Sequence, residues 1–457
     1  MDTIPIANYP LPTKSSLQWQ YVGKNLNDVF TPAVVIDRSV VKRNCDAMLE
    51  VSKALGVGFR AHVKSHKTLE LSKMQVGEDG PANFVVSTLI EAENLLSFLL
   101  ECQAKDRPCS VIYGVPIPQS AVSRLLCIAN KVQPGTLSVL IDNLDAFLEF
   151  EDQLEKTPNA RAIGVYLKID VGYQRAGTKT DSPKFGELVR TVIDKAGENF
   201  KGFYTHFGHS YGGSSEDDAA NGLLEELTGL EVATRAVPKS FKGRLVLTVG
   251  ATPTATAAQN LLSKSSEKAR EFKSILDDLK QKYSIELHAG VYPLLDLQQV
   301  ATHARPPVGE AKQGFEPLSR SNIGLKMLVE VTSVYEERAK PEALVSAGSL
   351  ALGREPCKSY PGWGVVTADL GNSGGNCIYD DRGNKTGWIV GRISQEHAIL
   401  TWEGPKEKAM PLSIGDKILI WPNHACVAGA GFGWYLVVDS TSDTNTIVDV
   451  WVRWRGW

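Results

Sequence analysis

The chain has 457 residues, of which 43% are hydrophobic and 22% are charged, and its formal net charge is −3. This composition is typical of a folded globular protein with two or three domains, and the charge argues against nucleic acid or an anionic membrane surface as a partner. No apolar run approaches the roughly 18 residues that span a bilayer, and the N-terminus has neither segment of a secretory signal.

Cysteine usage points to a reducing compartment. The chain has seven cysteines, an odd number scattered over its length: Cys45, Cys102, Cys109, Cys127, Cys357, Cys377 and Cys426. That pattern argues against a disulfide framework and favours free thiols. We therefore expect a soluble, cytoplasmic protein.

The first part of the chain alternates strands with helices. Residues 1–30 show no strong period, so we expect an N-terminal arm that joins the β domain described below. A β-branched run at 31–37 follows, and Ser39 is positioned to cap the next helix. Candidate strands then occur at 58–65, 83–87, 110–114, 137–142, 164–170, 202–206, 244–250 and 285–290. Amphipathic helical stretches separate them, which indicates a parallel sheet covered on both faces.

About eight strand-helix units in roughly 260 residues predict an α/β fold in which residues 31–304 form a closed (β/α)8 barrel. An open doubly wound sheet is the alternative, but its Gly-x-Gly-x-x-Gly fingerprint is missing after the first strand. Polar and unusual residues gather where the strands end: Lys64, Asp142, Asp170, His206, Gly250 and Gly290. In a barrel these ends form one face, the face that carries active sites.

The pattern changes after residue 304. Residues 305–322 are rich in breakers and mixed in charge, so we expect a linker or insertion. Residues 323–457 contain short strand candidates between turns, at 325–335, 342–347, 364–368, 387–393, 398–402, 417–421, 434–438 and 448–454. They predict a second, mostly β domain.

The stretch 60–68 (RAHVKSHKT) contains five basic or imidazole side chains in nine residues. Alternate residues of a strand share a face, so Arg60, His62 and Lys64 would point the same way. A lysine among such neighbours has a destabilised ammonium form, and its amine is available as a nucleophile or base. A solvated basic turn is the alternative interpretation.

Two further turns carry candidate anion-binding residues. Residues 248–254 (TVGATPT) follow an apolar strand, and their small residues let backbone amides approach a phosphate. Alone this signal is weak, and a tight βα turn is the alternative. In 169–177 (IDVGYQRAG), Arg175 lies in a glycine-flanked turn, as in a carboxylate or phosphate clamp. An exposed arginine in a capping turn is the alternative there.

Two more segments are dense in functional side chains. Residues 204–211 (YTHFGHSY) place two tyrosines and two histidines at a strand end, more than core packing alone explains. In 422–426 (PNHAC), His424 and Cys426 would share a face of an extended segment and could both reach one metal ion. Two ligands leave room for water or substrate, as in a catalytic site, although His-x-Cys also occurs by chance.

Taken together, these segments resemble the eukaryotic-type D-serine dehydratases, relatives of the D-threonine aldolases among the alanine-racemase-like pyridoxal phosphate enzymes. The resemblance covers nearly the whole chain and is carried by TPA at 31–33, HVKSHK at 62–67, YTH at 204–206, GHSY at 208–211, GATPT at 250–254, ELHAG at 286–290, SQEH at 394–397 and PNHAC at 422–426.

The resemblance implies a role for each matching residue. Lys64 forms the Schiff base with pyridoxal phosphate and is the catalytic residue. The other implied cofactor-binding residues are Gln174, Arg175, Tyr204, Tyr211, Gly250, Ala251, Thr252 and Gly290, and the implied zinc (Zn2+) ligands are His424 and Cys426. An aspartate commonly stands at the position of Cys426 in the aldolases, so the thiolate favours the dehydratases. Ala61 and Val291 depart from the expected Pro and Asn.

The implied activity is the zinc-dependent conversion of D-serine to pyruvate and ammonia by a homodimer, a step of D-amino acid catabolism. Two alternatives remain. A D-threonine aldolase or 3-hydroxyaspartate dehydratase would act on a related β-hydroxy D-amino acid. A non-catalytic pyridoxal phosphate-binding protein would need no metal pair.

Overall fold

The computed structural model describes residues 10–158, 160, 162–263, 267–305, 318–367 and 377–457. Within these residues, eight parallel strands close into a barrel in chain order. They are β2 (Gly58–His62), β3 (Ala82–Val86), β4 (Cys109–Pro116), β5 (Leu137–Ile141), β6 (Gly164–Lys168), β7 (Phe200–Tyr204), β8 (Val246–Val249) and β9 (Ser284–Ala289). The predicted (β/α)8 barrel is confirmed.

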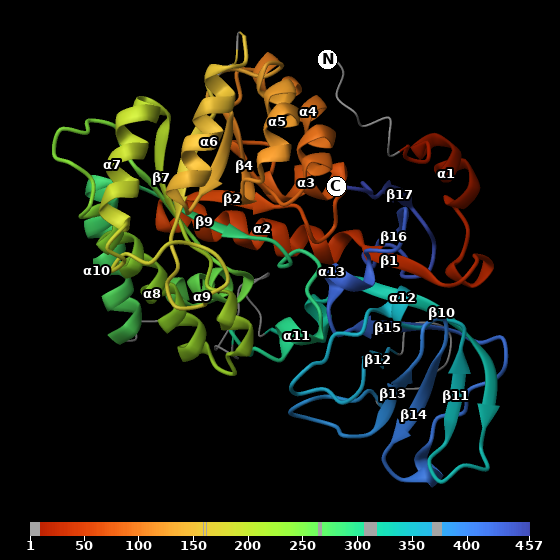
Figure 1. The fold of residues 1–457 in the computed structure, drawn as a ribbon. Helices are drawn as coiled ribbons and strands as arrows, with labels where there is room; N and C mark the ends of the chain where they lie inside the picture. Colours follow the sequence, from red (N-terminus) through yellow and green to blue (C-terminus); the bar gives the residue numbers. More distant parts are fainter. Residues whose placement is uncertain (1–9, 159, 161, 264–266, 306–317, 368–376) are drawn as a thin grey trace.

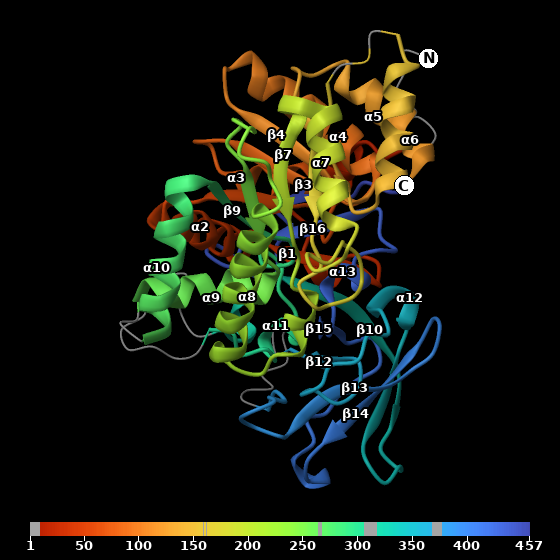
Figure 2. The ribbon, with the colours of Figure 1, turned by 60° about the vertical axis from the view of Figure 1, so that its left-hand side comes forward.

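Helices surround the barrel (Figure 1, Figure 2). They are α2 (Arg38–Leu55), α3 (Leu69–Val76), α4 (Leu89–Ala104), α5 (Val122–Ala129), α6 (Leu144–Glu155), α7 (Phe185–Ala196), α8 (Glu216–Thr234), α9 (Thr252–Ser263) and α10 (Glu267–Lys282). Helix α2 is capped by Asp37, whose side chain accepts hydrogen bonds from the backbone N–H groups of Ser39 and Val40. The prediction that Ser39 is the cap was wrong, because the carboxylate two residues earlier reaches the first-turn amides.

The second domain is built on a sheet of nine strands within the described residues, in the order β11-β14-β13-β12-β15-β10-β1-β16-β17. Their bounds are β1 (Ala33–Asp37), β10 (Leu325–Tyr335), β11 (Glu342–Val345), β12 (Gly364–Val366), β13 (Gly387–Ile393), β14 (Ala398–Glu403), β15 (Lys417–Pro422), β16 (Trp434–Val438) and β17 (Asp449–Val452). An additional antiparallel pairing of β11 with β10 closes six of them into a small antiparallel barrel.

Strand β1 belongs to this sheet and not to the large barrel. It pairs antiparallel with β10 and parallel with β16. The prediction that the barrel begins at residue 31 assigned β1 to the barrel, and that assignment was wrong. The local sequence cannot distinguish the two, because a strand buried on both faces reads as the same apolar run in either sheet. Here Val34 and Ile36 face the main core, and Val35 faces a second cluster.

The described part of the N-terminal arm lies against the β domain. Helix α1 (Lys14–Tyr21) runs beside β17 (Figure 1), and Leu17 and Tyr21 pack into the same apolar cluster as Val450. Lys14 and Gln18 both bond the carboxylate of Asp449, at 3.3 and 2.8 Å. The arm therefore covers the outer edge of the nine-stranded sheet.

Short elements join the two domains on the carboxyl side of the barrel. Of the short helices in the described residues, α11 and α13 take part in these contacts; the full set is α11 (Leu297–Val300), α12 (Ser349–Leu352), α13 (Ala425–Ala428), η2 (Leu26–Asp28), η3 (Gln119–Ala121), η4 (Gly197–Asn199), η5 (Gly208–Gly212), η6 (Arg320–Asn322) and η7 (Lys406–Lys408). Asp296, at the start of α11, accepts a hydrogen bond from the Ala425 amide at 2.9 Å. The Trp454 amide donates to the Lys67 carbonyl at 2.8 Å. The first of these bonds holds the segment 422–426 against the barrel, and the second holds Trp454, which follows β17, against the turn after β2.

Most of the expected linker 305–322 lies outside the described residues. Among the helices that the structure does describe, none combines the length and the apolar character needed to cross a membrane.

A buried ion pair ties β2 to β9 inside the barrel. Arg60 donates to both carboxylate oxygens of Glu286, at 2.9 and 3.0 Å, and also to Ser110 at 2.9 Å. Replacing Arg60 with Met leaves the Glu286 carboxylate buried without its partner. We expect the free energy of unfolding, measured by urea denaturation, to fall by about 3–5 kcal/mol.

The double variant Arg60→Met with Glu286→Gln separates charge from packing. Removing both charges is expected to restore most of the lost stability, because no buried ion is then left alone. A double variant as unstable as Arg60→Met would assign the loss to packing.

Candidate active site

A cavity of about 290 Å3 lies at the carboxyl ends of the barrel strands and contacts both domains. Its lining residues are His62, Lys64, Ser65, Tyr173, Arg175, His206, Gly208, Ala251, Thr252, His288, Ala289, Gly290, Val291, Gln298, Glu355, His424 and Cys426. The lysine predicted from the basic stretch and the predicted metal pair, some 360 residues apart in the chain, line the same cavity.

Lys64 lies in the turn that follows β2, and the contacts of His66 and Lys67 hold this turn in place. The His66 ring is buried between two partners: the Thr68 amide donates to Nδ1 at 3.1 Å, and Nε2 lies 2.9 Å from the Gln75 side-chain oxygen. Because Nδ1 accepts, the proton of the neutral ring belongs on Nε2. Lys67 forms an ion pair of 3.1 Å with the buried carboxylate of Glu91.

The basic stretch carries less charge around Lys64 than its sequence suggests. Arg60 is neutralised by Glu286, and Lys67 by Glu91. Burial, followed by the charge of Lys64, holds the pKa of His62 well below its usual range, so this imidazole is neutral. The expected cluster of charged neighbours is therefore a set of paired or neutral groups that hold the turn in place.

His66 gives a testable pH dependence. Burial lowers its pKa from 6.5 to about 4, although the hydrogen bond to Gln75 opposes this. The unfolded chain then binds more protons than the folded chain between these pH values. The contribution of His66 to stability is complete above pH 6.5 and is lost as the pH falls toward 4, at up to about 1.4 kcal/mol per pH unit.

We expect His66→Gln to make the free energy of unfolding, measured in urea between pH 4 and 7, less dependent on pH than in the wild type. Every other titrating group is common to the two proteins, so the difference in slope isolates this ring. Equal slopes would contradict the assignment.

Buried aromatic and basic side chains form the floor of the cavity. The Tyr204 ring stacks on the His288 ring, with centroids 4.3 Å apart, and the Lys168 ammonium lies 4.8 Å from the Tyr204 centroid. Tyr204 is buried beneath the cavity and does not line it. Burial, with Arg175 as the next cause, lowers the pKa of Lys168 to about 8. Lys168 was not among the site residues predicted from the sequence, although a lysine that ends the apolar strand β6 was a signal.

Two of the histidines that line the cavity, His62 and His288, each have one ring nitrogen without a hydrogen-bond partner among the described residues. Burial lowers the pKa of both His206 and His288 well below the usual range. His206 Nδ1 lies 2.9 Å from the Gly250 carbonyl oxygen, and His288 Nδ1 lies 3.0 Å from the Thr248 hydroxyl. His288 Nε2 and His62 Nδ1 are buried with no hydrogen-bond partner among the described residues. The cavity thus offers buried nitrogens for a bound molecule.

The loop after β8 is shaped by close backbone contacts. Gly250 has φ +140°, and a Cβ there would lie 2.2 Å from the His288 carbonyl oxygen, so only glycine fits. The Ala251 amide is already bonded to the Thr254 hydroxyl at 2.8 Å, and Thr252 Oγ1 accepts from the Val291 amide at 3.2 Å. Gly250 shapes the loop without lining the cavity, whereas Thr252 lines it at the start of α9, where first-turn amides lack intrahelical partners.

The predicted arginine turn is only partly in the cavity. Asp170 accepts hydrogen bonds from the amides of Gly172 and Gln174, both at 3.0 Å, which fixes the turn. Arg175 lines the cavity and lies 5.1 Å from the Tyr173 ring centroid. Gln174 has φ +55° and an exposed side chain outside the cavity lining. Tyr211 lies in η5, and its side chain is outside the described part of the structure.

His424 and Cys426 meet through a helix start and not through an extended segment. His424 is the N-cap of α13 and Cys426 lies in its first turn, because the chain turns helical at Ala425. Burial is the largest single influence on both side chains and opposes their charged forms. Their mutual hydrogen bond and the charges around them together outweigh it, raising the pKa of His424 to about 9 and lowering that of Cys426. Cys426 Sγ also lies 3.1 Å from the hydroxyl of Ser65, the neighbour of Lys64.

An imidazole nitrogen and a thiolate are ligands that zinc prefers. Among the described residues, no third His, Cys, Asp or Glu joins them in a group that could hold a metal ion. Glu355 lines the same cavity. The donor set therefore fits a metal with open positions.

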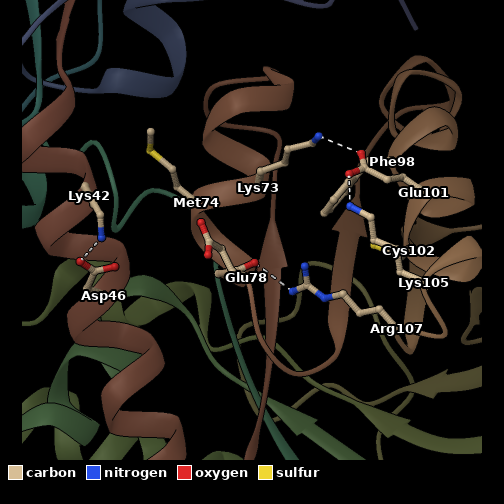
Figure 3. Close-up of a pocket in the computed structure, with 11 residues that line it drawn as sticks. Lys42, Asp46, Lys73, Met74, Glu78, Phe98, Glu101, Cys102, Lys105 and Arg107 are labelled. Carbon is tan, nitrogen blue, oxygen red and sulfur yellow. Dashed lines mark hydrogen bonds and ion pairs between the residues drawn. The ribbon is translucent and has the colours of Figure 1, made fainter.

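A second cavity of about 580 Å3 lies on the outer surface, against α2, α3 and α4 (Figure 3). Most of its charges pair with one another: Lys42 with Asp46 at 2.6 Å, and Lys73 and Lys105 with Glu101 at 3.0 and 2.9 Å. These pairs leave few polar groups to bind a ligand. We therefore place the candidate site in the smaller cavity at the barrel's carboxyl face.

Two protein families match most of the chain. The "Alanine racemase, N-terminal domain" matches residues 36–286, and the "Putative serine dehydratase domain" matches residues 324–438. The D-serine dehydratase of Schizosaccharomyces pombe is 35% identical, over 97% of this chain and 96% of its own length. The D-serine dehydratase of Saccharomyces cerevisiae is 32% identical, over 96% of this chain and 99% of its own.

Solved structures share the fold. D-threo-3-hydroxyaspartate dehydratase from Delftia sp. HT23 superposes with a TM-score of 0.72 at 25% identity, over 95% of this chain and 100% of that chain. A structure of a variant of that dehydratase with cysteine replaced by alanine is described as the metal-free form. D-threonine aldolase from Filomicrobium marinum has a TM-score of 0.67 at 19% identity, over 94% of this chain and 96% of that chain, a likeness of fold alone.

Proposed function

The chain belongs to the D-serine dehydratase family, and we propose that it converts D-serine to pyruvate and ammonia with pyridoxal phosphate held at Lys64 and zinc held by His424 and Cys426. One observation carries the proposal: Lys64 and the His424–Cys426 pair line one cavity. A cofactor-binding lysine alone is compatible with many reactions, whereas a metal pair beside it suits the loss of a hydroxyl group.

The cavity fits pyridoxal phosphate. The Lys64 side chain lines the cavity, and so do His62 and His288, each of which has one buried ring nitrogen with no hydrogen-bond partner among the described residues. The phosphate would lie near Arg175 and the first turn of α9 at Thr252, where a cation, a hydroxyl and helix amides meet. Three other predicted cofactor-binding residues would act by shaping the cavity: Gly250, Tyr204 and Gly290.

The reaction removes the α-proton and the β-hydroxyl of D-serine as water, and hydrolysis then yields pyruvate and ammonia. When bound, pyridoxal phosphate supplies an electron sink for the α-carbon. Lys64 is proposed to take the α-proton, and the imidazoles of His62, His206 and His288, which burial keeps neutral, add no charge of their own. His424 and Cys426 would hold a zinc ion that acts as a Lewis acid toward the leaving hydroxyl, and Ser65 orients the thiolate.

The main alternative substrate is a related β-hydroxy D-amino acid. The D-threo-3-hydroxyaspartate dehydratase of Delftia is 27% identical over 93% of this chain, and the aldolase shares the fold. A dehydratase of 3-hydroxyaspartate would form oxaloacetate, and an aldolase acting on D-threonine would form glycine and an aldehyde. A non-catalytic cofactor-binding protein would turn over none of these, and the paired His424 and Cys426 count against it.

A substrate panel tests the proposal. The purified protein, supplied with pyridoxal phosphate, is incubated with D-serine, D-threonine and D-threo-3-hydroxyaspartate, and pyruvate, oxaloacetate and glycine are quantified. We expect pyruvate from D-serine as the fastest product, lost on chelation and restored by zinc. Glycine or oxaloacetate as the main product would transfer the assignment to an alternative, and turnover unaffected by chelators would contradict the metal role.

The cytoplasmic location and the homodimer expected from the sequence belong to the same proposal. All seven cysteines are free, which supports a reducing compartment. Sedimentation of the purified protein would test the dimer.

A further inference from the structure

Glu226 is a fully buried carboxylate beside the cavity that the proposed reaction does not use. It lies on α8, which runs next to α9 (Figure 2). Its Oε1 accepts hydrogen bonds from the backbone amides of Phe207 and Gly250, both at 2.9 Å. Its Oε2 accepts from the Thr254 hydroxyl at 3.0 Å. One side chain therefore joins the loop after β7 to the loop after β8.

The bonds of Glu226 reach the residues that shape the proposed phosphate site. The Thr254 hydroxyl that it holds also accepts the Ala251 amide at 2.8 Å. The Gly250 carbonyl is bonded to His206, which lines the cavity. Through these contacts Glu226 fixes both the loop that leads into α9 and the imidazole opposite it.

Helix α8 also approaches these loops at a glycine. Gly222, one turn before Glu226, is buried, and a Cβ there would lie 2.7 Å from the Phe207 ring and 3.1 Å from the Thr254 methyl group. Glycine at this position lets the helix come close enough for the glutamate to reach both backbone amides. Residues i and i+4 of a helix share a face, so the glycine and the carboxylate act on the same surface.

Burying an ionisable group costs free energy, so packing alone does not explain why a glutamate is buried at this position. Burial raises the pKa of Glu226 to about 7, while its bonds from Gly250, Thr254 and Phe207 oppose that rise. Thr254 Oγ1 also lies 3.2 Å from the Ala251 carbonyl, an alternative acceptor that keeps the hydroxyl bonded if the carboxyl is protonated. The Thr254 hydroxyl thus has an acceptor in either protonation state of Glu226.

We propose that Glu226 is a positioning residue for the phosphate group of the cofactor, acting through the Gly250–Thr254 loop. This inference rests on the proposed function, because it assumes that a phosphate-bearing cofactor binds here. A residue that supports a binding loop from outside affects affinity for the group that the loop binds, and typical losses are tenfold to a hundredfold.

The test compares a ligand with and without the phosphate. Full-length protein freed of cofactor is titrated with pyridoxal phosphate and with pyridoxal, and binding is followed by visible absorbance. For Glu226→Leu we expect the dissociation constant for pyridoxal phosphate to rise tenfold to a hundredfold and that for pyridoxal to change less than about threefold. Glu226→Gln keeps an oxygen for both amides, so it should recover most of the affinity.

Glu225→Leu is the matched control, because Glu225 is the preceding residue of the same helix and is exposed. Thr254→Val removes the hydroxyl that bonds Glu226 and should weaken pyridoxal phosphate binding in the same selective way, which decides the question if the leucine variant does not fold. Equal losses of affinity for pyridoxal phosphate and pyridoxal would overturn the inference. So would an affinity for pyridoxal phosphate that stays at the wild-type value in all three variants, Glu226→Leu, Glu226→Gln and Thr254→Val. Wild-type protein that binds no pyridoxal phosphate would instead overturn the proposed function.

Discussion

Replacing Lys64 with alanine is expected to abolish the visible absorbance of bound pyridoxal phosphate and to lower pyruvate formation from D-serine by at least about 1,000-fold. Two functions are lost at once: the covalent attachment of the cofactor and the base that takes the α-proton. Absorbance and turnover are measured on the same protein samples, with circular dichroism to establish that the fold is intact.

Lys168 provides the control for this prediction. It lies on the same face of the barrel, it is buried, and burial lowers its pKa to about 8, so it is the rival candidate for the reactive amine. In Lys168→Met we expect the cofactor absorbance to persist. Absorbance retained in Lys64→Ala but lost in Lys168→Met would show that Lys168, and not Lys64, holds the cofactor.

Replacing Cys426 or His424 with alanine is expected to lower pyruvate formation by about 100- to 1,000-fold while leaving the cofactor absorbance in place. The hydroxyl is a poor leaving group, and Lewis-acid assistance is worth several kcal/mol of barrier. Zinc content, measured by atomic absorption, should fall from the wild-type value in both variants.

Cys357→Ala is a suitable control for the thiol, because Cys357 is another free, partly buried cysteine of the β domain and does not line the cavity. It should keep wild-type zinc content and turnover. Undiminished turnover in Cys426→Ala, or cofactor lost together with the metal, would contradict a division of labour between the lysine and the metal pair.

The barrel could be predicted from the sequence because its strands are short apolar runs that recur with helices between them. The ends of those strands also gave the position of the site: Lys64, His206 and Gly290 line one cavity. Strand β1 was harder, since its partners lie far along the chain and its own residues suit either sheet.

Contacts within the site were less predictable. The basic stretch suggested a charged neighbourhood, but Arg60 and Lys67 are paired with carboxylates that come from distant segments. Glu226 was missed because a glutamate within the pattern of an amphipathic helix reads as a solvated residue. Only the fold reveals that this helix turns the side chain inward, toward two backbone amides that need an acceptor.

The pairing of β1 also has a consequence for how the protein is made. A ribosome synthesises β1 before the large barrel, but its neighbours β10 and β16 emerge only after the whole barrel has been translated. At about 5–20 residues per second, that interval is on the order of a minute or less. During it, both edges of β1 lack the partners that they have in the finished sheet, so completion of the C-terminal domain is the step that brings β1 into that sheet.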